Sequence, residues 1–350
     1  MKPISLFFLV LVTYLPASAE RRAKNVILLL ADAGGTSTLH AASVYGHGAP
    51  RKLFVQSMPN IGLSDTSPAG NWVTDSAAGM TAIVTGSKTQ NGVLSQSDTA
   101  VRGKVDGTPL KTILEYAEEH GLSTGIVTNQ PYFDATPAAC YSQVNDRGAT
   151  AKILEMFLKP RFGDGVDLLV GAGRKRALAA VPDFLTRAEA QKYVVLNSPA
   201  ELSEQSRVVA IVDGRFELAP VMQKAIDILS KNKKGYFLMV EWDAHTDNPK
   251  AGLDRVVEFD NAIRDAAQRR DMKNTLMLFT ADHSFDLRMI GGRPGGDLFT
   301  AGVLKTEGHH SGEEVLVAAQ GPGASRVHGY MANTDLFGVM MAAFGWRAGN

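Results

Sequence analysis

Cysteine is almost absent from this sequence of 350 residues, which contains Cys140 and no second cysteine. An intrachain disulfide is therefore excluded, so the fold must be stabilised by its hydrophobic core and by any metal that it binds. Cys140 itself is most simply interpreted as a small, buried hydrophobic side chain.

An excess of charge of one sign is also lacking, since 36 lysines and arginines balance 36 aspartates and glutamates. Proteins that bind nucleic acids or dock on anionic membranes usually carry a basic surface. The sequence gives no electrostatic reason to expect either partner, and it indicates an ordinary surface of mixed charge.

Long apolar runs are confined to the first 19 residues, so no later stretch predicts a membrane helix. Lys2 gives a positive start, an apolar run follows over residues 4–15, and residues 17–19 (Ala-Ser-Ala) supply a small-x-small cleavage site. This layout is typical of a secretory signal peptide, and we expect a cut after Ala19 and a periplasmic or secreted protein. The alternative is an uncleaved anchor.

Apolar runs of β type alternate with helical patterns along the rest of the chain. We expect strands at residues 25–31, 122–128, 166–170, 235–240 and 275–280, and helices at residues 110–120, 220–230 and 252–269. This alternation predicts a three-layer α/β sandwich, with a mainly parallel central sheet flanked by helices. We expect a single domain over residues 20–350, with a peripheral insertion around residues 174–215.

Acidic residues lie at several predicted strand ends, namely Asp32, Asp75, Glu241 and Asp282. Ligands of open α/β sheets bind beyond the carboxyl ends of the strands, where these side chains would converge. Their charges would repel one another strongly unless cations lay among them. The sequence therefore predicts a cation site at this edge, and the alternative is separate solvation of each strand end.

Ser76 follows Asp75 and precedes a run of small residues, which indicates the start of a tightly packed helix. Backbone N–H groups at a helix N-terminus bind phosphate oxygens. A serine in that position could attack a bound phosphate if a metal lowered the pKa of its hydroxyl. The alternative is that Ser76 only caps the helix.

Histidines accompany these carboxylates. Asp282 and His283 follow a predicted strand, and adjacent oxygen and nitrogen donors in such a loop suit zinc. Glu241 and His245 could meet at one ion if the segment turned helically, and His310 provides a further imidazole.

The segment from Val73 to Ala82 closely resembles the nucleophile signature of alkaline phosphatases. Further segments resemble that family in the same order along the chain, namely residues 25–32, 85–92, 134–139, 167–174, 280–283, 310–315 and 321–323. Arg147 lies where the family places its phosphate-binding arginine.

The resemblance implies an alkaline phosphatase-like fold and a secreted, metal-dependent phosphomonoesterase with a phosphoserine intermediate on Ser76. It implies two zinc ions and one magnesium ion. The residues that it implies are Asp32, Asp282, His283 and Ser76 for one zinc, His245 and His310 plus a carboxylate for the second, and Asp32 and Thr136 near the magnesium.

The sequence departs from the family pattern around Glu241. The family has a glutamate for magnesium, an aspartate for zinc five residues later, and a histidine four residues after that. Only Glu241 precedes His245 by four residues here, so we assign Glu241 to the second zinc, with Asp243 as the alternative. The magnesium site then lacks its glutamate; Asp134, Asp243 or water would complete it, or it is absent. We expect Trp242 to line the cleft.

Two other functions compete with the monoesterase. One is a phosphodiesterase or nucleotide pyrophosphatase of the same superfamily, and the other is a catalytically silent metal-binding protein. The resemblance implies small phosphate monoesters as ligands and leaves a monomer and a homodimer both open.

Overall fold

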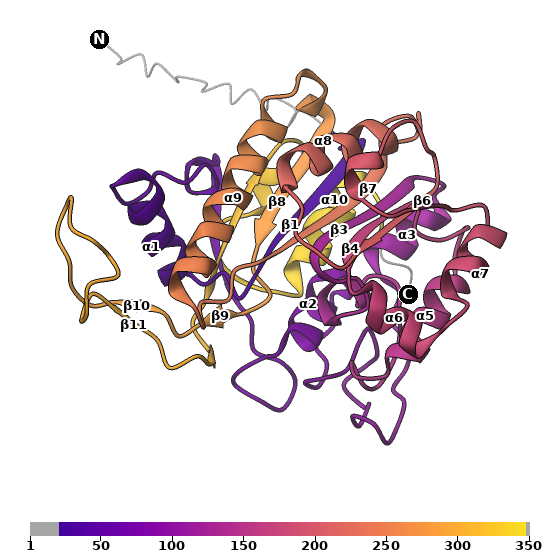
Figure 1. Cartoon of the computed structure of the whole chain (residues 1–350), viewed down its shortest axis with the longest axis horizontal. Helices are drawn as coiled ribbons and strands as arrows, with labels where there is room; N and C mark the ends of the chain where they lie inside the picture. The colour runs from indigo at the N-terminus through magenta and orange to yellow at the C-terminus, as the bar shows by residue number, and fades with distance from the viewer. Residues whose placement is uncertain (1–20, 348–350) are drawn as a thin grey trace, which may run out of the picture.

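The computed structural model describes residues 21–347, and the predicted signal peptide lies outside the described residues (Figure 1). A ten-stranded sheet crosses the protein in the order β14-β2-β13-β8-β1-β7-β3-β4-β6-β5. Its strands are β1 (Asn25–Asp32), β2 (Asn60–Asp65), β3 (Ser123–Pro131), β4 (Leu168–Ala172), β5 (Val194–Leu196), β6 (Val208–Val212), β7 (Tyr236–Asp243), β8 (Thr275–Thr280), β13 (Val315–Gln320) and β14 (Gly329–Ala332). Within the described part of the chain, no helix is both long and apolar enough to cross a membrane.

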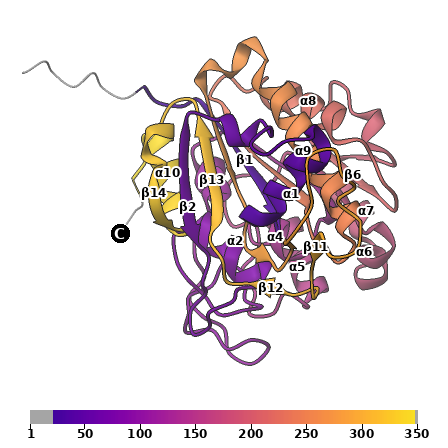
Figure 2. The ribbon, with the colours of Figure 1, turned by 90° about the vertical axis from the view of Figure 1, so that its left-hand side faces the viewer.

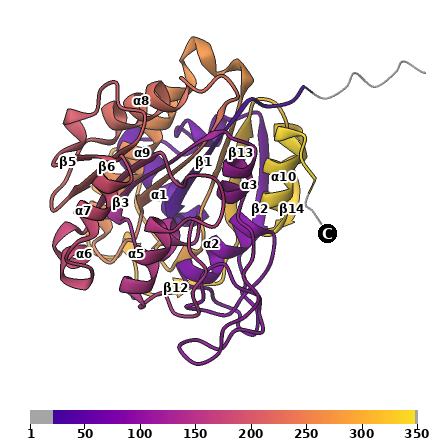
Figure 3. The same cartoon turned by 90° about the vertical axis from the view of Figure 1, so that its right-hand side faces the viewer.

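The sheet is mainly parallel, as the sequence predicts. β1 pairs in parallel with β7 and β8, and β3 pairs in parallel with β7 and β4. β13 is antiparallel to both of its neighbours, β8 and β2. Figure 2 shows β14, β2 and β13 side by side, and Figure 3 shows β14 and β5 on opposite sides of the protein.

Strand β1 lies in the middle of the sheet because its apolar side chains are buried on both faces. Leu28 and Leu30 belong to one hydrophobic cluster, whereas Ile27 and Leu29 belong to the other. The first cluster contains residues of α2 (Ser76–Thr85), α3 (Ile113–Glu119), α4 (Ala135–Ala138), α5 (Thr150–Leu158), α6 (Arg174–Ala180), α7 (Phe184–Ala190) and α10 (Asp335–Phe344). The second contains residues of α1 (Thr36–His47), α8 (Leu218–Leu229) and α9 (Pro249–Ala267). The predicted three-layer α/β sandwich is therefore confirmed.

Short elements complete the chain. They are the 3-10 helices η1 (Val55–Ser57), η2 (Pro199–Glu201), η3 (Arg270–Asn274) and η4 (Ala324–Arg326), and the two-residue strands β9 (Ser284–Phe285), β10 (Arg288–Met289), β11 (Leu304–Lys305) and β12 (His310–Ser311). β9 pairs with β12, and β10 pairs with β11 in a segment that projects from the body of the protein in Figure 1.

The segment around residues 174–215 is peripheral but contributes to the sheet. It forms α6, α7 and the strands β5 and β6. β6 pairs in parallel with β4, and β5 pairs in parallel with β6. The segment therefore extends the central sheet at one edge.

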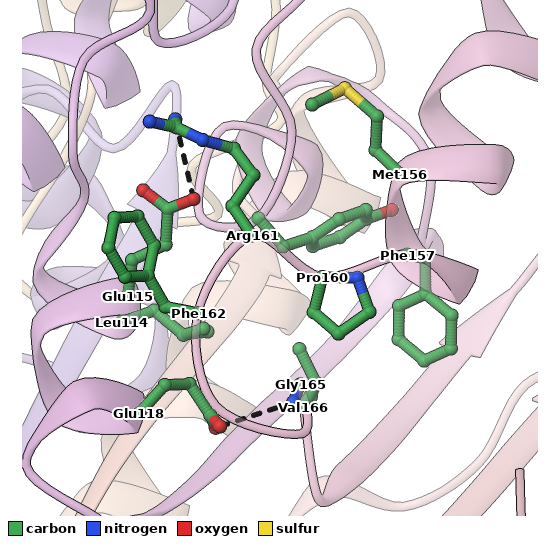
Figure 4. A pocket seen from close by; sticks show the side chains of 11 residues that line it. Leu114, Glu115, Glu118, Met156, Phe157, Pro160, Arg161, Phe162, Gly165 and Val166 are labelled. Atoms are coloured by element: carbon green, nitrogen blue, oxygen red, sulfur yellow. Dashed lines mark hydrogen bonds and ion pairs between the residues drawn. The ribbon is translucent and has the colours of Figure 1, made fainter.

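A small hollow of about 20 Å³ lies beside α3, and Glu118 is one of its lining residues (Figure 4). The Glu118 carboxylate accepts hydrogen bonds from the Thr124 hydroxyl at 2.6 Å and from the Gly165 backbone N–H at 3.2 Å. Burial, together with the negative charges of Asp167 and Asp164, raises the pKa of Glu118 to about 8.

This raised pKa predicts a pH-dependent stability. The unfolded carboxyl loses its proton near pH 4.5, whereas the folded one keeps it up to about pH 8. The free energy of unfolding should therefore fall as the pH rises through this window, by on the order of 2–4 kcal/mol. Glu118→Gln should flatten that fall when urea unfolding is measured from pH 5 to pH 8.

The exposed neighbour Glu119 provides the matched control. Its pKa is lowered by the hydrogen bond from Lys111, so Glu119→Gln should not flatten the fall. Parallel stability profiles for the wild-type and Glu118→Gln proteins would contradict the prediction.

Candidate active site

A polar hollow of about 260 Å³, here called the site hollow, opens at the carboxyl ends of β1, β3 and β7. Its lining residues are Asp32, Ser76, Gln130, Asp134, Arg147, Asp243, His245, Asp247 and His310. Asp32 and Asp243 end neighbouring strands in direct register, which is why two segments far apart in the sequence meet there. The structure therefore brings most of the predicted site residues to one place.

Asp32, Asp282 and His283 form the buried floor of this site. Their ligand atoms all lie within 4.8 Å of one another. The His283 Nε2 atom is 3.4 Å from Asp32 Oδ1 and 3.5 Å from Asp282 Oδ2. Asp282 Oδ1 accepts hydrogen bonds from the backbone N–H groups of Ala33 and His283, which fixes its orientation.

Two carboxylate oxygens of this group lack a hydrogen bond. Asp32 Oδ1 and Asp282 Oδ2 are buried, and no residue described by the structure donates a hydrogen bond to either of them. Burial and the charges of Asp282 and Glu241 raise the pKa of Asp32 well above its usual value. Such groups are costly to bury unless a proton or a cation compensates them, so the donor set fits a divalent metal.

Three imidazoles are also gathered here, because ligand atoms of His245, His283 and His310 lie within 4.8 Å of one another. The rings of His283 and His310 stack with centroids 3.8 Å apart. Burial lowers the pKa of His283 to about 4, so its ring is neutral near pH 7. A neutral imidazole can offer a nitrogen lone pair to a metal.

Hydrogen bonds set which nitrogen each imidazole offers. His283 Nδ1 is 3.1 Å from the Ser284 carbonyl, and His310 Nδ1 is 3.0 Å from the Thr74 carbonyl. His245 Nδ1 is 2.8 Å from Asp243 Oδ1. Carbonyl oxygens only accept, and so does an ionised carboxylate, so each Nδ1 carries the proton and each Nε2 is left as a donor atom for a metal.

Ser76 is the first residue of α2 and is buried beside this group. Its Oγ atom lies 3.2 Å from His283 Nε2. Asp75, and not Ser76, is the N-cap, because the Asp75 carboxylate accepts the Ala78 backbone N–H. Gly79 allows α2 to pack this closely, since a Cβ atom there would lie 2.5 Å from the Asp282 carbonyl oxygen.

Arg147 is held next to Ser76 by two carboxylates. Its Nη1 atom is 3.2 Å from Asp75 Oδ2, and its Nη2 atom is 3.0 Å from Asp134 Oδ1. Asp134 also caps α4, the short helix that carries Thr136. The guanidinium is thus positioned on the wall of the site hollow before any ligand binds.

Glu241 and Asp243 lie in different surroundings. The Glu241 carboxylate accepts hydrogen bonds from the hydroxyls of Thr128 and Thr136, and burial raises its pKa to about 8. Asp243 instead bonds His245 and lies 3.1 Å from Arg255 Nη2. The structure therefore places Glu241 with Thr136, and places Asp243 with His245.

Trp242 points away from the site hollow, because alternate side chains of a strand face opposite sides of the sheet. It is 3% exposed and belongs to the second hydrophobic cluster. Its ring packs edge-on against Phe216, with centroids 5.5 Å apart. Trp242 is therefore not among the residues that line the site hollow.

Several residues of this site carry no recognisable signal in the sequence. Gln130 and Asp247 line the site hollow. Asp286 accepts hydrogen bonds from the Thr306 hydroxyl at 2.6 Å and from the backbone N–H groups of Glu307 at 2.8 Å and Gly308 at 3.2 Å. It thereby fixes the turn that leads into His310.

Comparison with known proteins identifies relatives of this chain. The family model described as alkaline phosphatase matches residues 23–182 and 213–301. The alkaline phosphatase of Escherichia coli is 28% identical, over 94% of this chain and 88% of its own length. The streptomycin-6-phosphate phosphatase of Streptomyces griseus is 30% identical, over 94% of this chain and 92% of its own length.

Solved structures agree with these relatives. The alkaline phosphatase of the Antarctic bacterium TAB5 matches with a TM-score of 0.81 and 26% identity, over 94% of this chain and all of that chain. A mutant of that enzyme was solved with magnesium in its M3 site, and it matches with a TM-score of 0.79 and 25% identity, over the same shares of both chains.

We predict that Asp286→Ala weakens metal binding although Asp286 does not line the site hollow. Without its three hydrogen bonds, the turn before His310 would no longer be fixed. The affinity for zinc should fall by about tenfold or more, as it does when groups that orient metal ligands are removed. Competition with a chelator of known affinity measures this change.

Asp297 offers a matched control, since it accepts the Phe299 backbone N–H in an exposed turn of the same region. Asp297→Ala should leave the zinc affinity within about twofold of the wild type. Equal affinities for all three proteins would show that Asp286 does not position His310.

Proposed function

Because this chain belongs to the alkaline phosphatase family and is a phosphatase, we propose that it hydrolyses phosphate monoesters through a phosphoserine on Ser76. The observation that carries this proposal is the position of Ser76. Ser76 is the first residue of helix α2, and its hydroxyl lies 3.2 Å from the buried imidazole of His283. Ser76 and Arg147 both line the site hollow. The proposed nucleophile therefore lies close to the buried carboxylates and imidazoles and to a guanidinium group that can bind phosphate.

The charged groups suggest how three cations would be held. Asp32, Asp282 and His283, next to Ser76, would hold one zinc, and His245 and His310 would hold a second. Bound there, the cations would neutralise the carboxylates, promote ionisation of the attacking hydroxyl and stabilise charge on the leaving oxygen.

We assign Glu241 to the third cation, which we propose to be magnesium, together with Asp32 and Thr136. The hydrogen bond that the Glu241 carboxylate accepts from the Thr136 hydroxyl supports this assignment. Asp243 is then the carboxylate that serves the second zinc site, since it orients His245. This reverses the assignment that the four-residue spacing between Glu241 and His245 suggests.

The chain's own residues account for the steps of the reaction. Arg147 presents two N–H groups that can bind two phosphoryl oxygens at once. The Ser76 hydroxyl gives its proton to water, and its oxygen attacks phosphorus. A new O–P bond forms, the P–O bond to the alcohol breaks, and the alcohol oxygen takes a proton from water. Water then attacks the phosphoserine, which releases inorganic phosphate and restores the serine hydroxyl.

Arg147 also favours monoesters over diesters. A monoester offers three terminal oxygens, and the charge on them is what a guanidinium fork recognises. We propose that the protein acts outside the cytoplasm, on the evidence of the signal-like sequence over residues 1–19.

We predict that the protein with zinc and magnesium hydrolyses p-nitrophenyl phosphate with a higher kcat/KM than bis-p-nitrophenyl phosphate. Ser76→Ala should lower kcat on the monoester by at least about a thousandfold, because the nucleophile is lost. Acid quenching of the wild-type protein during turnover of a phosphorus-labelled substrate should trap label on Ser76.

Ser87, which follows the C-terminal end of the same helix, offers a control substitution. Ser87→Ala should retain both the turnover and the trapped label. A Ser76→Ala protein with full turnover would reject the covalent route, and a faster reaction with the diester would reject the monoesterase.

We predict that Glu241→Gln and Asp243→Asn affect different metals. Glu241→Gln should keep its zinc but lose the activation that added magnesium gives. Asp243→Asn should bind zinc more weakly by about tenfold or more, since it orients a metal-binding imidazole. Metal analysis after dialysis and a magnesium titration of activity distinguish the two, and loss of one zinc from Glu241→Gln would restore the opposite assignment.

A further inference from the structure

A second hollow of about 230 Å³ adjoins the site hollow. It lies at the carboxyl ends of β3 and β7, beside the start of α8. Its lining residues are Asn129, Gln130, Gly214, Arg215, Phe216, Trp242, Asp243, Ala251, Arg255 and Glu258. Gln130 and Asp243 line both hollows, so the two share a wall.

An aromatic side chain and amide groups characterise this second hollow. Phe216 is half-buried, and its ring is held at 77° to the buried ring of Trp242. The Trp242 indole N–H is buried behind Phe216, and no residue in the described part of the chain accepts a hydrogen bond from it. Asn129 and Gln130 supply amide groups, which can donate to and accept from hydroxyls.

The formal charges of the second hollow cancel. Arg215 and Arg255 balance Asp243 and Glu258. Arg255 is already engaged, since it lies 3.1 Å from Asp243 Oδ2 and donates to the carbonyl oxygens of Asp243 and His245. A neutral wall of this kind gives no preference for a strongly charged ligand.

We propose that the second hollow is the subsite for the leaving group and that it takes a neutral, polyhydroxylated ring, such as the sugar of a sugar phosphate. A ring of this kind has an apolar face that can pack on Phe216 and hydroxyls that can bond the amides. The proposal rests on the proposed function, which places the phosphoryl group beside Ser76 in the site hollow.

The reaction itself requires a space of this kind. In an in-line displacement, the leaving oxygen lies on the side of phosphorus opposite the attacking Ser76 oxygen. The alcohol therefore points away from Ser76, which lines the site hollow and not the second hollow, and Gln130 and Asp243 form the wall that the two hollows share. When the P–O bond breaks, the alcohol oxygen takes a proton from water and the sugar leaves.

Glucose 6-phosphate and ethyl phosphate test this inference, because both release a primary alcohol but only the sugar is large enough to fill the second hollow. With zinc and magnesium bound, the wild-type protein should have a kcat/KM for glucose 6-phosphate about tenfold higher than its kcat/KM for ethyl phosphate. A difference of this size is the effect of one well-packed contact. Phe216→Ala should lose about fivefold more kcat/KM on glucose 6-phosphate than on ethyl phosphate. Arg215 lies on the exposed wall of the second hollow, and Arg215→Ala should also lower the ratio of kcat/KM on glucose 6-phosphate to kcat/KM on ethyl phosphate.

Tyr330→Ala is the control, since Tyr330 is 74% exposed on β14 at the far edge of the sheet. It should leave the ratio unchanged. Equal kcat/KM values on both esters, or equal losses of kcat/KM in Phe216→Ala, would overturn the subsite. Hydrolysis of p-nitrophenyl phosphate in the same experiment would still support the proposed function. A wild-type protein that hydrolysed none of the three esters would overturn both.

Discussion

The burial of like charges at one edge of the sheet is the constraint on which this structure depends. Asp32 and Asp282 each bury an oxygen that accepts no hydrogen bond from residues 21–347, and Glu241 is also buried. A protein interior stabilises such a group only by protonation or by an opposite charge. Cations at this site would therefore act as structural as well as chemical components of the fold.

The scaffold around these groups is arranged to hold them still. The central strand β1 carries Asp32, and its apolar residues are packed on both faces of the sheet. Gly79 lets α2 approach the Asp282 backbone, which brings Ser76 to the same cluster. Each site imidazole is oriented through its Nδ1 atom, so the geometry of the site follows from backbone carbonyls and Asp243.

The sequence predicted the fold and the candidate site well where the signal was local. Buried β-type runs marked the central strands, and acidic residues at their ends marked the edge where the site lies. Sequence patterns could not decide whether Glu241 or Asp243 lies beside His245. β7 continues through Asp243, so Glu241 and His245 are not one helical turn apart. Residues two apart in a strand share a face but differ by about 6.6 Å in depth, which places Glu241 against Thr128 and Asp243 at the edge. The place of Gln130 in the site depends on the order of the strands, and that of Asp286 depends on hydrogen bonds within a turn. Sequence patterns reveal neither.

The same alternation lets β7 serve both hollows. Glu241 and Asp243 face the charged cluster, while Trp242 between them faces the second hollow and supports Phe216. Phe216 follows β6 closely, and the family model does not match residues 183–212, which contain β5 and β6. Ser76 and Arg147 therefore lie in segments that the family model matches, whereas Phe216 lies just beyond a segment that the family model does not match. A change in that segment could alter the preferred alcohol without disturbing the groups that act on phosphorus.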